Sequence, residues 1–202
     1  MQGIGLTARG QVFRQDGPRA SLAVRLNTKV WLRRLTWAAG VGPAVTDNNL
    51  IIRHRGEGDR LWFTGGGMHT WKATAEETGG AFLCFEDQMT AGKFTPLHAH
   101  PGIHEVLYVL DGEIRVWDDG AERAVTTGGF VLVQPGAAHA FLTVQPTRLL
   151  CVQTPGDGQA FFRATSDPAA AGQVDGPLDA PRVRAATREH PGGVFLAPPP
   201  FA

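Results

Sequence analysis

Residues 92–112 read GKFTPLHAHPGIHEVLYVLDG, and this stretch constrains what the rest of the chain can be. It places His98 and His100 one residue apart and Glu105 five residues further on. In an extended chain, residues i and i+2 point to the same face, so the two imidazoles can bind one ion together. A Pro-Gly break follows, and a strand resumes near Glu105, whose carboxylate can supply a third ligand. Imidazole and carboxylate groups both bind divalent transition metals, so the stretch predicts a metal site.

Short apolar runs separated by turn residues surround this stretch. HTWKAT (69–74) and AFLCFEDQM (81–89) flank AEETGG and are predicted to be two antiparallel strands. HEVLYVL and EIRVWDD are separated by Asp111-Gly112, which predicts a hairpin. The runs FVLVQPG, AHAFLTV and RLLCVQT follow, with turn residues between them. Many short strands at nearly regular spacing predict an all-β sandwich or barrel.

The spacing of these residues resembles the two sequence signatures of the cupin superfamily. The first signature runs without a gap through Gly92, His98, His100, Glu105 and Gly112. The second begins fifteen residues later and runs through Gly128, Gln134-Pro135-Gly136 and His139. Two departures are visible: Gln134 stands where the family usually has proline, and Thr143 stands where an asparagine is frequent. Neither departure removes a ligand.

The resemblance implies a cupin jelly-roll β-barrel, also called a double-stranded β-helix. It further implies that His98, His100, Glu105 and His139 converge on one divalent transition metal ion inside the barrel. Three neutral imidazoles and one carboxylate leave such an ion with one net positive charge. In octahedral geometry two positions stay open for water, dioxygen or substrate oxygens. This donor set does not discriminate among Fe, Mn, Ni, Co, Cu and Zn.

Strand alternation predicts which side chains face the barrel interior. If Glu105 points inward, Leu107 does too, and His139 brings Phe141 inward by the same argument. Leu107 and Phe141 are therefore predicted walls of a substrate pocket, although core packing alone would also explain them. His104 is expected on the opposite face. His69 is predicted to be an edge-loop histidine without a role in the site.

Several further segments resemble single-domain cupins similar to bacterial quercetin 2,3-dioxygenases. They are WKATAEETGGAF, PGDGQAFFR and the terminal APPPF, within about residues 57–202. This resemblance implies a metal-dependent dioxygenase that acts on an aromatic enol or flavonol-type small molecule, with Glu105 as both ligand and catalytic base. Two alternatives remain open. One is a redox-neutral metal-dependent cupin, such as an isomerase, decarboxylase or polyketide cyclase, and the other is a non-catalytic cupin that binds a small ligand.

Three regions are expected along the chain. Residues 1–55 carry nine Lys or Arg against two acidic residues and are predicted to be a basic, non-catalytic or loosely ordered extension. Residues 56–165 are predicted to form the cupin barrel. Residues 166–202 are predicted to hold short helices, with Pro181 suited to a first helical turn, and a proline-rich tail ending VFLAPPPFA.

Composition limits the other partners. With 43% hydrophobic residues and zero net charge, the chain has no signature of nucleic-acid binding. It has no run of eighteen apolar residues, so no membrane span is expected. Its two cysteines lie in apolar runs and are expected to be buried free thiols in a reducing, cytoplasmic location. A homodimer is expected, since a partner often covers the open edges of a jelly roll.

Overall fold

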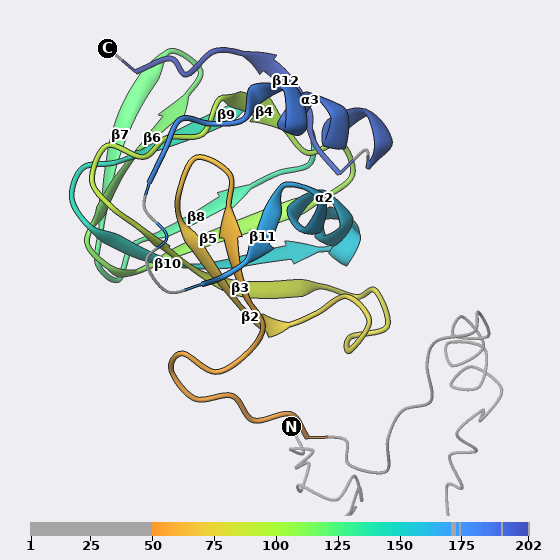
Figure 1. Cartoon of the computed structure of the whole chain (residues 1–202). Coiled ribbons are helices and arrows are strands. Elements are labelled where there is room, and N and C mark those ends of the chain that lie inside the picture. The colour runs from red at the N-terminus through yellow and green to blue at the C-terminus, as the bar shows by residue number, and fades with distance from the viewer. Residues whose placement is uncertain (1–49, 171–172, 174, 191, 202) are drawn as a thin grey trace, which may run out of the picture. The chain divides into compact units, whose positions relative to one another are not determined.

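A computed structural model describes residues 50–170, 173, 175–190 and 192–201, and its strands form two antiparallel sheets (Figure 1). The order of the seven-stranded sheet is β11 (Ser166–Pro168), β1 (Arg60–Phe63), β2 (Met68–Ala73), β3 (Leu83–Met89), β10 (Thr147–Thr154), β5 (His104–Asp111) and β8 (Phe130–Val133). The order of the five-stranded sheet is β12 (Val194–Ala197), β4 (Leu97–Ala99), β9 (His139–Thr143), β6 (Glu113–Asp118) and β7 (Ala121–Thr126). The predicted all-β jelly roll is confirmed.

The chain repeatedly crosses from one sheet to the other, and the turn at Asp111-Gly112 is one of these crossings. β5 pairs with β10 and β8, whereas β6 pairs with β7 and β9, so the hairpin predicted at this turn was wrong. Gly112 has a φ of +94°, and a Cβ there would lie 2.7 Å from the carbonyl oxygen of Pro146. Glycine is therefore required both by the backbone conformation and by the neighbouring β9–β10 connection. By contrast, β2 and β3 pair as predicted around AEETGG.

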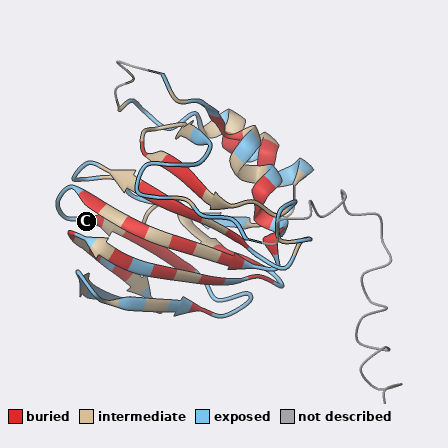
Figure 2. Cartoon of the chain, turned by 90° about the horizontal axis from the view of Figure 1, so that it is seen from below, coloured by how far each residue is buried: buried red, intermediate tan, exposed pale blue. Residues whose placement is uncertain are grey.

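Alternate side chains of the strands face the interior, as the banded colouring in Figure 2 shows. In β5, Glu105, Leu107 and Val109 are buried while His104 and Tyr108 are exposed, which confirms the predicted facing of this strand. Buried side chains from both sheets form one core: Trp71, Leu83, Phe85, Leu107, Val109, Ile114, Val116, Phe141, Leu149 and Cys151. The core therefore fixes the register of β5 and orients Glu105 toward the space between the sheets.

The outer face of the seven-stranded sheet keeps apolar surface at its β8 edge. Tyr108, Phe130 and Leu132 are exposed there. The homodimer expected from edge-strand arguments stays a prediction. Cys84 and Cys151 are free thiols as expected, but only Cys151 is buried and Cys84 is half-buried. No helix in the described part of the chain is long and apolar enough to cross a membrane.

Two α-helices follow β10 in the described part of the chain, one just before residue 165 and one within residues 166–202, where short helices were predicted. They are α2 (Gln159–Ala164), which follows the 3-10 turn η2 (Gly156–Gly158), and α3 (Ala180–Glu189). Pro181 lies in the first turn of α3, and the Asp179 side chain caps this helix by accepting a hydrogen bond from the Arg182 amide at 3.0 Å. The region also supplies β11 and β12, so the sheets extend beyond residue 165, where the barrel was expected to end. Each added strand satisfies the backbone groups of an otherwise open edge.

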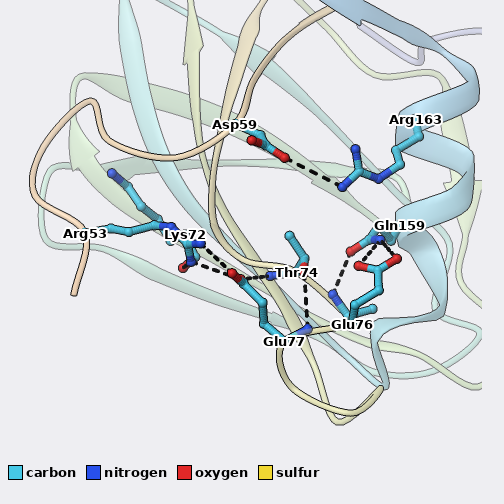
Figure 3. A network of polar contacts seen from close by, with 9 residues as sticks. Arg53, Asp59, Lys72, Thr74, Glu76, Glu77, Gln159 and Arg163 are labelled. Carbon is cyan, nitrogen blue, oxygen red and sulfur yellow. Dashed lines mark hydrogen bonds and ion pairs between the residues drawn. The ribbon is translucent and has the colours of Figure 1, made fainter. Parts of the chain in front are cut away.

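A polar network joins the segment before β1 to the β2–β3 connection and to α2 (Figure 3). The Arg53 guanidinium donates to the Lys72 carbonyl at 2.7 Å and to the Glu77 carboxylate at 2.9 Å. Gln159 of α2 donates to the Glu76 carboxylate at 2.6 Å. Residues 1–49 of the expected basic extension lie outside the described residues, but Arg53 contacts the barrel directly.

Replacing Arg53 with alanine is expected to lower the free energy of unfolding by about 1 kcal/mol, because two partly exposed hydrogen-bond partners lose their donor. Chemical unfolding in urea measures this change. Arg55→Ala is the matched control, since Arg55 is exposed and makes no polar side-chain contact within the described segments. Equal unfolding midpoints for the two variants would contradict the anchoring role of Arg53.

Candidate metal centre

Four side chains from three strands converge between the two sheets. His98 lies in β4, His100 directly after it, His139 in β9 and Glu105 in β5. Their ligand atoms all lie within 4.8 Å of one another. His98 and His139 are direct partners across the β4–β9 ladder, and Glu105 approaches from the opposite sheet. The residues that the sequence pattern singled out as ligands are therefore brought together, and this cluster could hold a metal ion.

Backbone carbonyls orient all three imidazole rings in the same way. In each ring Nδ1 forms a hydrogen bond with a backbone carbonyl oxygen. His98 bonds to Pro96 at 2.8 Å, His100 to Gly192 at 2.8 Å and His139 to Ala137 at 3.0 Å. A ring nitrogen that bonds a carbonyl must carry the proton, so Nδ1 is the donor and each neutral ring turns the lone pair of Nε2 toward the cluster. Metal-binding histidines are oriented by the same kind of contact.

The C-terminal segment supports two of these ligands. Gly192, which accepts the hydrogen bond from His100, lies 92 residues away in the sequence. β12 pairs with β4 so that Phe195 lies opposite His98. The segment predicted to be a helical and proline-rich tail therefore also contributes a wall to the site.

The distances around Glu105 test whether a cation fits. Its Oε2 lies 3.1 Å from His139 Nε2 and 3.6 Å from His100 Nε2, and the latter nitrogen is buried without a hydrogen-bond partner. A carboxylate oxygen and an imidazole lone pair at these distances repel each other unless a proton or a metal ion lies between them. One divalent ion would satisfy all four groups at once. The donor set and its geometry therefore fit a transition metal.

The same proximity shifts the pKa values of the cluster. Burial alone would raise the pKa of the Glu105 carboxylate. The interactions with His100 and His139 lower it by more, so the pKa of Glu105 lies well below its usual value. Burial and the neighbouring histidines lower the pKa of His98 to about 3. For His100, burial opposes the charge, but Glu105 raises the pKa. At neutral pH, Glu105 and His98 are thus already in their metal-binding forms.

Acid is expected to destabilise the metal-free protein because of His98. Its folded pKa of about 3 lies below the ordinary histidine value near 6.5, so unfolding takes up a proton between these pH values. Stability should fall by about 1.4 kcal/mol per pH unit as the pH drops from 6.5 to 4.5. Thermal unfolding of chelator-treated protein measures the slope. His98→Gln should flatten it, and an unchanged slope in that variant would contradict the assignment.

Gln153 is a member of the site that the sequence argument missed. It is buried in β10 directly opposite Glu105, and its side-chain amide donates to Glu105 Oε1 at 2.8 Å. A Cβ at Gly158 would collide with the amide oxygen of Gln153, so glycine is needed there for Gln153 to keep this position. The sequence did contain a signal for Gln153, because it is a polar residue at an inward-facing position of the strand RLLCVQT. The bond leaves Oε2 of Glu105 free for the cluster.

Gln153→Leu is expected to weaken metal binding by roughly 10- to 100-fold, the usual effect of losing a group that orients a ligand. Competition with a coloured chelator measures the affinity. Gln134→Leu is the matched control, since Gln134 is exposed. If the two variants bind metal equally well, Gln153 does not orient Glu105.

A cavity of about 380 Å³ opens from the cluster into the barrel. Leu107 and Phe141 line it together with Phe85 and Phe162, so both predicted wall residues border the same space as three of the candidate ligands, His98, His100 and Glu105. Cavities of this size hold small molecules.

The prediction for His69 was wrong: it is buried within β2 and also lines the cavity. Alternation in β2 turns it inward, and three aromatic neighbours cover it.

The fold and the cluster together define a class of protein, a jelly-roll barrel whose interior could hold a metal ion. Residues 85–153 match the family model of the cupin domain, and this range includes all four residues of the cluster. This segment of the chain is therefore similar to a cupin domain.

Among known proteins, quercetin 2,3-dioxygenase of Bacillus subtilis (strain 168) is 33% identical over 118 residues. The match covers 58% of this chain but 35% of that protein, so the chain spans about a third of the length of this relative. Similar solved structures include ectoine synthase from P. lautus, with 19% identity, a TM-score of 0.49, and coverage of 65% of this chain and 98% of the other. The polyketide cyclase RemF from Streptomyces resistomycificus has 19% identity, a TM-score of 0.46, and coverage of 53% and 80%.

Proposed function

We propose that the chain is a metal-dependent cupin dioxygenase that acts on an aromatic enol of the flavonol type. The observation that carries this proposal is that three of the four candidate ligands, His98, His100 and Glu105, line a cavity with largely apolar and aromatic walls. The 33% identity to a quercetin 2,3-dioxygenase supports the same substrate class. No cluster of Arg or Lys lines this cavity, where Lys93 is its one basic side chain among the described residues, so a phosphorylated substrate is disfavoured.

In this proposal His98, His100, Glu105 and His139 hold one divalent transition metal. Such an ion would polarise the enol and carbonyl oxygens of the substrate and make it reactive toward dioxygen. Glu105 accepts the enol proton, because it is deprotonated at neutral pH and lines the same cavity as His98 and His100.

Three other side chains support this step. Gln153 holds Oε1 of Glu105 in place, while Oε2 points toward the His100 and His139 nitrogens of the cluster. Leu107 and Phe141 pack against the substrate rings and exclude water from the reacting end. The proposal thus gives a role to each residue predicted as a pocket wall.

Incubation of metal-loaded protein with a flavonol in air tests the proposal, with chelator-treated protein as the control. The expected result is oxygen uptake with loss of the flavonol and release of one carbon monoxide per turnover, and no reaction in the control. Metal-loaded protein that leaves flavonol and oxygen untouched would contradict the dioxygenase. The redox-neutral candidates, an isomerase, decarboxylase or polyketide cyclase, would then be preferred.

A further inference from the structure

A buried histidine–aspartate pair lies in the same cavity, outside the metal cluster. His69 of β2 and Asp87 of β3 are direct partners across the ladder, with 4% and 7% of their surface exposed. Both line the cavity that the ligands border. The proposed mechanism uses neither residue, and ordinary packing does not explain a carboxylate at an inward position of β3.

Both side chains have polar atoms without partners. His69 Nδ1 and Asp87 Oδ1 are buried and make no hydrogen bond to any described residue. The distance between His69 Nε2 and Asp87 Oδ1 is 3.6 Å, too long for a hydrogen bond between them. Burying such groups unpaired is costly, and a ligand group that bonds both would offset that cost. The pair therefore points to a polar group supplied from the cavity.

The surroundings of the pair indicate which group this is. The His69 ring packs against Phe63, Phe85 and Phe162, with ring centroids 5.3, 4.7 and 5.3 Å away. A hydroxyl can donate to the carboxylate of Asp87 and accept from an N–H of His69 at the same time. The aromatic walls favour a hydroxyl that is carried on an aromatic ring.

Strand register gives the separation between this pair and the metal cluster. Asp87 lies opposite Leu149 of β10, whereas Glu105 lies opposite Gln153 of the same strand. The two positions are four residues apart, which corresponds to about 13 Å between backbone positions along β10, and they lie on opposite sides of that strand. A compound that reaches both sites must therefore be elongated, with two or three rings.

We propose that His69 and Asp87 form a second subsite that binds a phenolic hydroxyl at the end of the substrate remote from the metal. This inference rests on the proposed function, because it assumes that the other end of the substrate lies at the cluster. It narrows the substrate class to elongated aromatic enols with a hydroxyl on a distal ring. The pair positions the substrate and takes no part in the chemical step.

Equilibrium binding of matched flavonols under nitrogen tests the subsite, because turnover cannot then occur. The probes are 3-hydroxyflavone and its two analogues that carry one further hydroxyl, at position 7 or at position 4′. Metal-loaded wild-type protein should bind one analogue about tenfold more tightly than the parent, the effect of one buried hydrogen-bonded hydroxyl. His69→Phe and Asp87→Leu should reduce this preference to less than about twofold. His54→Phe, at an exposed position, is the matched control and should retain it.

Metal content and thermal unfolding are measured for every variant, and Asp87→Ala replaces Asp87→Leu if the latter does not fold. A preference that persists in both pair variants, or that is absent from wild type, overturns the subsite. If flavonols are turned over but show no such preference, the proposed function stands and the subsite fails. If the preference depends on the pair but no oxygen is consumed, the subsite stands and the dioxygenase fails. If no flavonol binds, both are wrong.

Discussion

Replacing Glu105 or His100 with alanine is expected to reduce the bound metal from one ion per chain to none. Each change removes one of four donor atoms that lie within 4.8 Å of one another. The alanine at Glu105 also removes the negative charge that offsets a divalent ion in a buried site. Elemental analysis of protein that has been loaded with metal and then desalted measures the stoichiometry.

His104→Ala is the matched control for both variants. His104 adjoins Glu105 in the sequence but lies on the exposed face of β5. Its removal should leave one ion per chain. Unchanged metal content in both the Glu105 and His100 variants would mean that the cluster is not the metal centre.

Glu105→Gln is expected to lower turnover of a flavonol by at least about 100-fold, the usual contribution of a positioned general base. The amide keeps the shape of the side chain and an oxygen donor, but it cannot accept the enol proton. Turnover is measured at saturating metal, so that weaker metal binding does not contribute to the loss. The test separates the role of Glu105 as base from its role as ligand.

Glu122→Gln is the control for the same chemical change at an exposed site, where Arg115 is the ion-pair partner of Glu122 among the described residues. It should have wild-type turnover. Wild-type turnover in Glu105→Gln, with metal bound, would show that the enol proton goes elsewhere and that Glu105 is only a ligand.

Two of the four candidate ligands could be predicted from local geometry, and the other two from the resemblance to a family pattern. His98 and His100 share a strand face by alternation, and the spacing to Glu105 and His139 follows a family pattern. The jelly roll followed from strand lengths and turn residues. The turn at Asp111-Gly112 was mistaken for a hairpin, because a positive φ at glycine suits a crossing between sheets equally well.

Other members of the site depend on contacts that local patterns do not encode. Gln153 meets Glu105 across 48 residues, and the Gly192 carbonyl meets His100 across 92. His69 faces the cavity only because the register of β2 against β3 sets it opposite Asp87. Such pairings are decided by the register of whole sheets, which a single sequence does not show.

The most direct test of the metal centre is a crystal structure of metal-loaded protein with anomalous scattering measured at the absorption edge of the metal. The account predicts one strong anomalous peak between the sheets, about 2.0–2.3 Å from Nε2 of His98, His100 and His139 and from an oxygen of Glu105. A peak elsewhere in the molecule, or metal-loaded protein with no peak at these four residues, would contradict it.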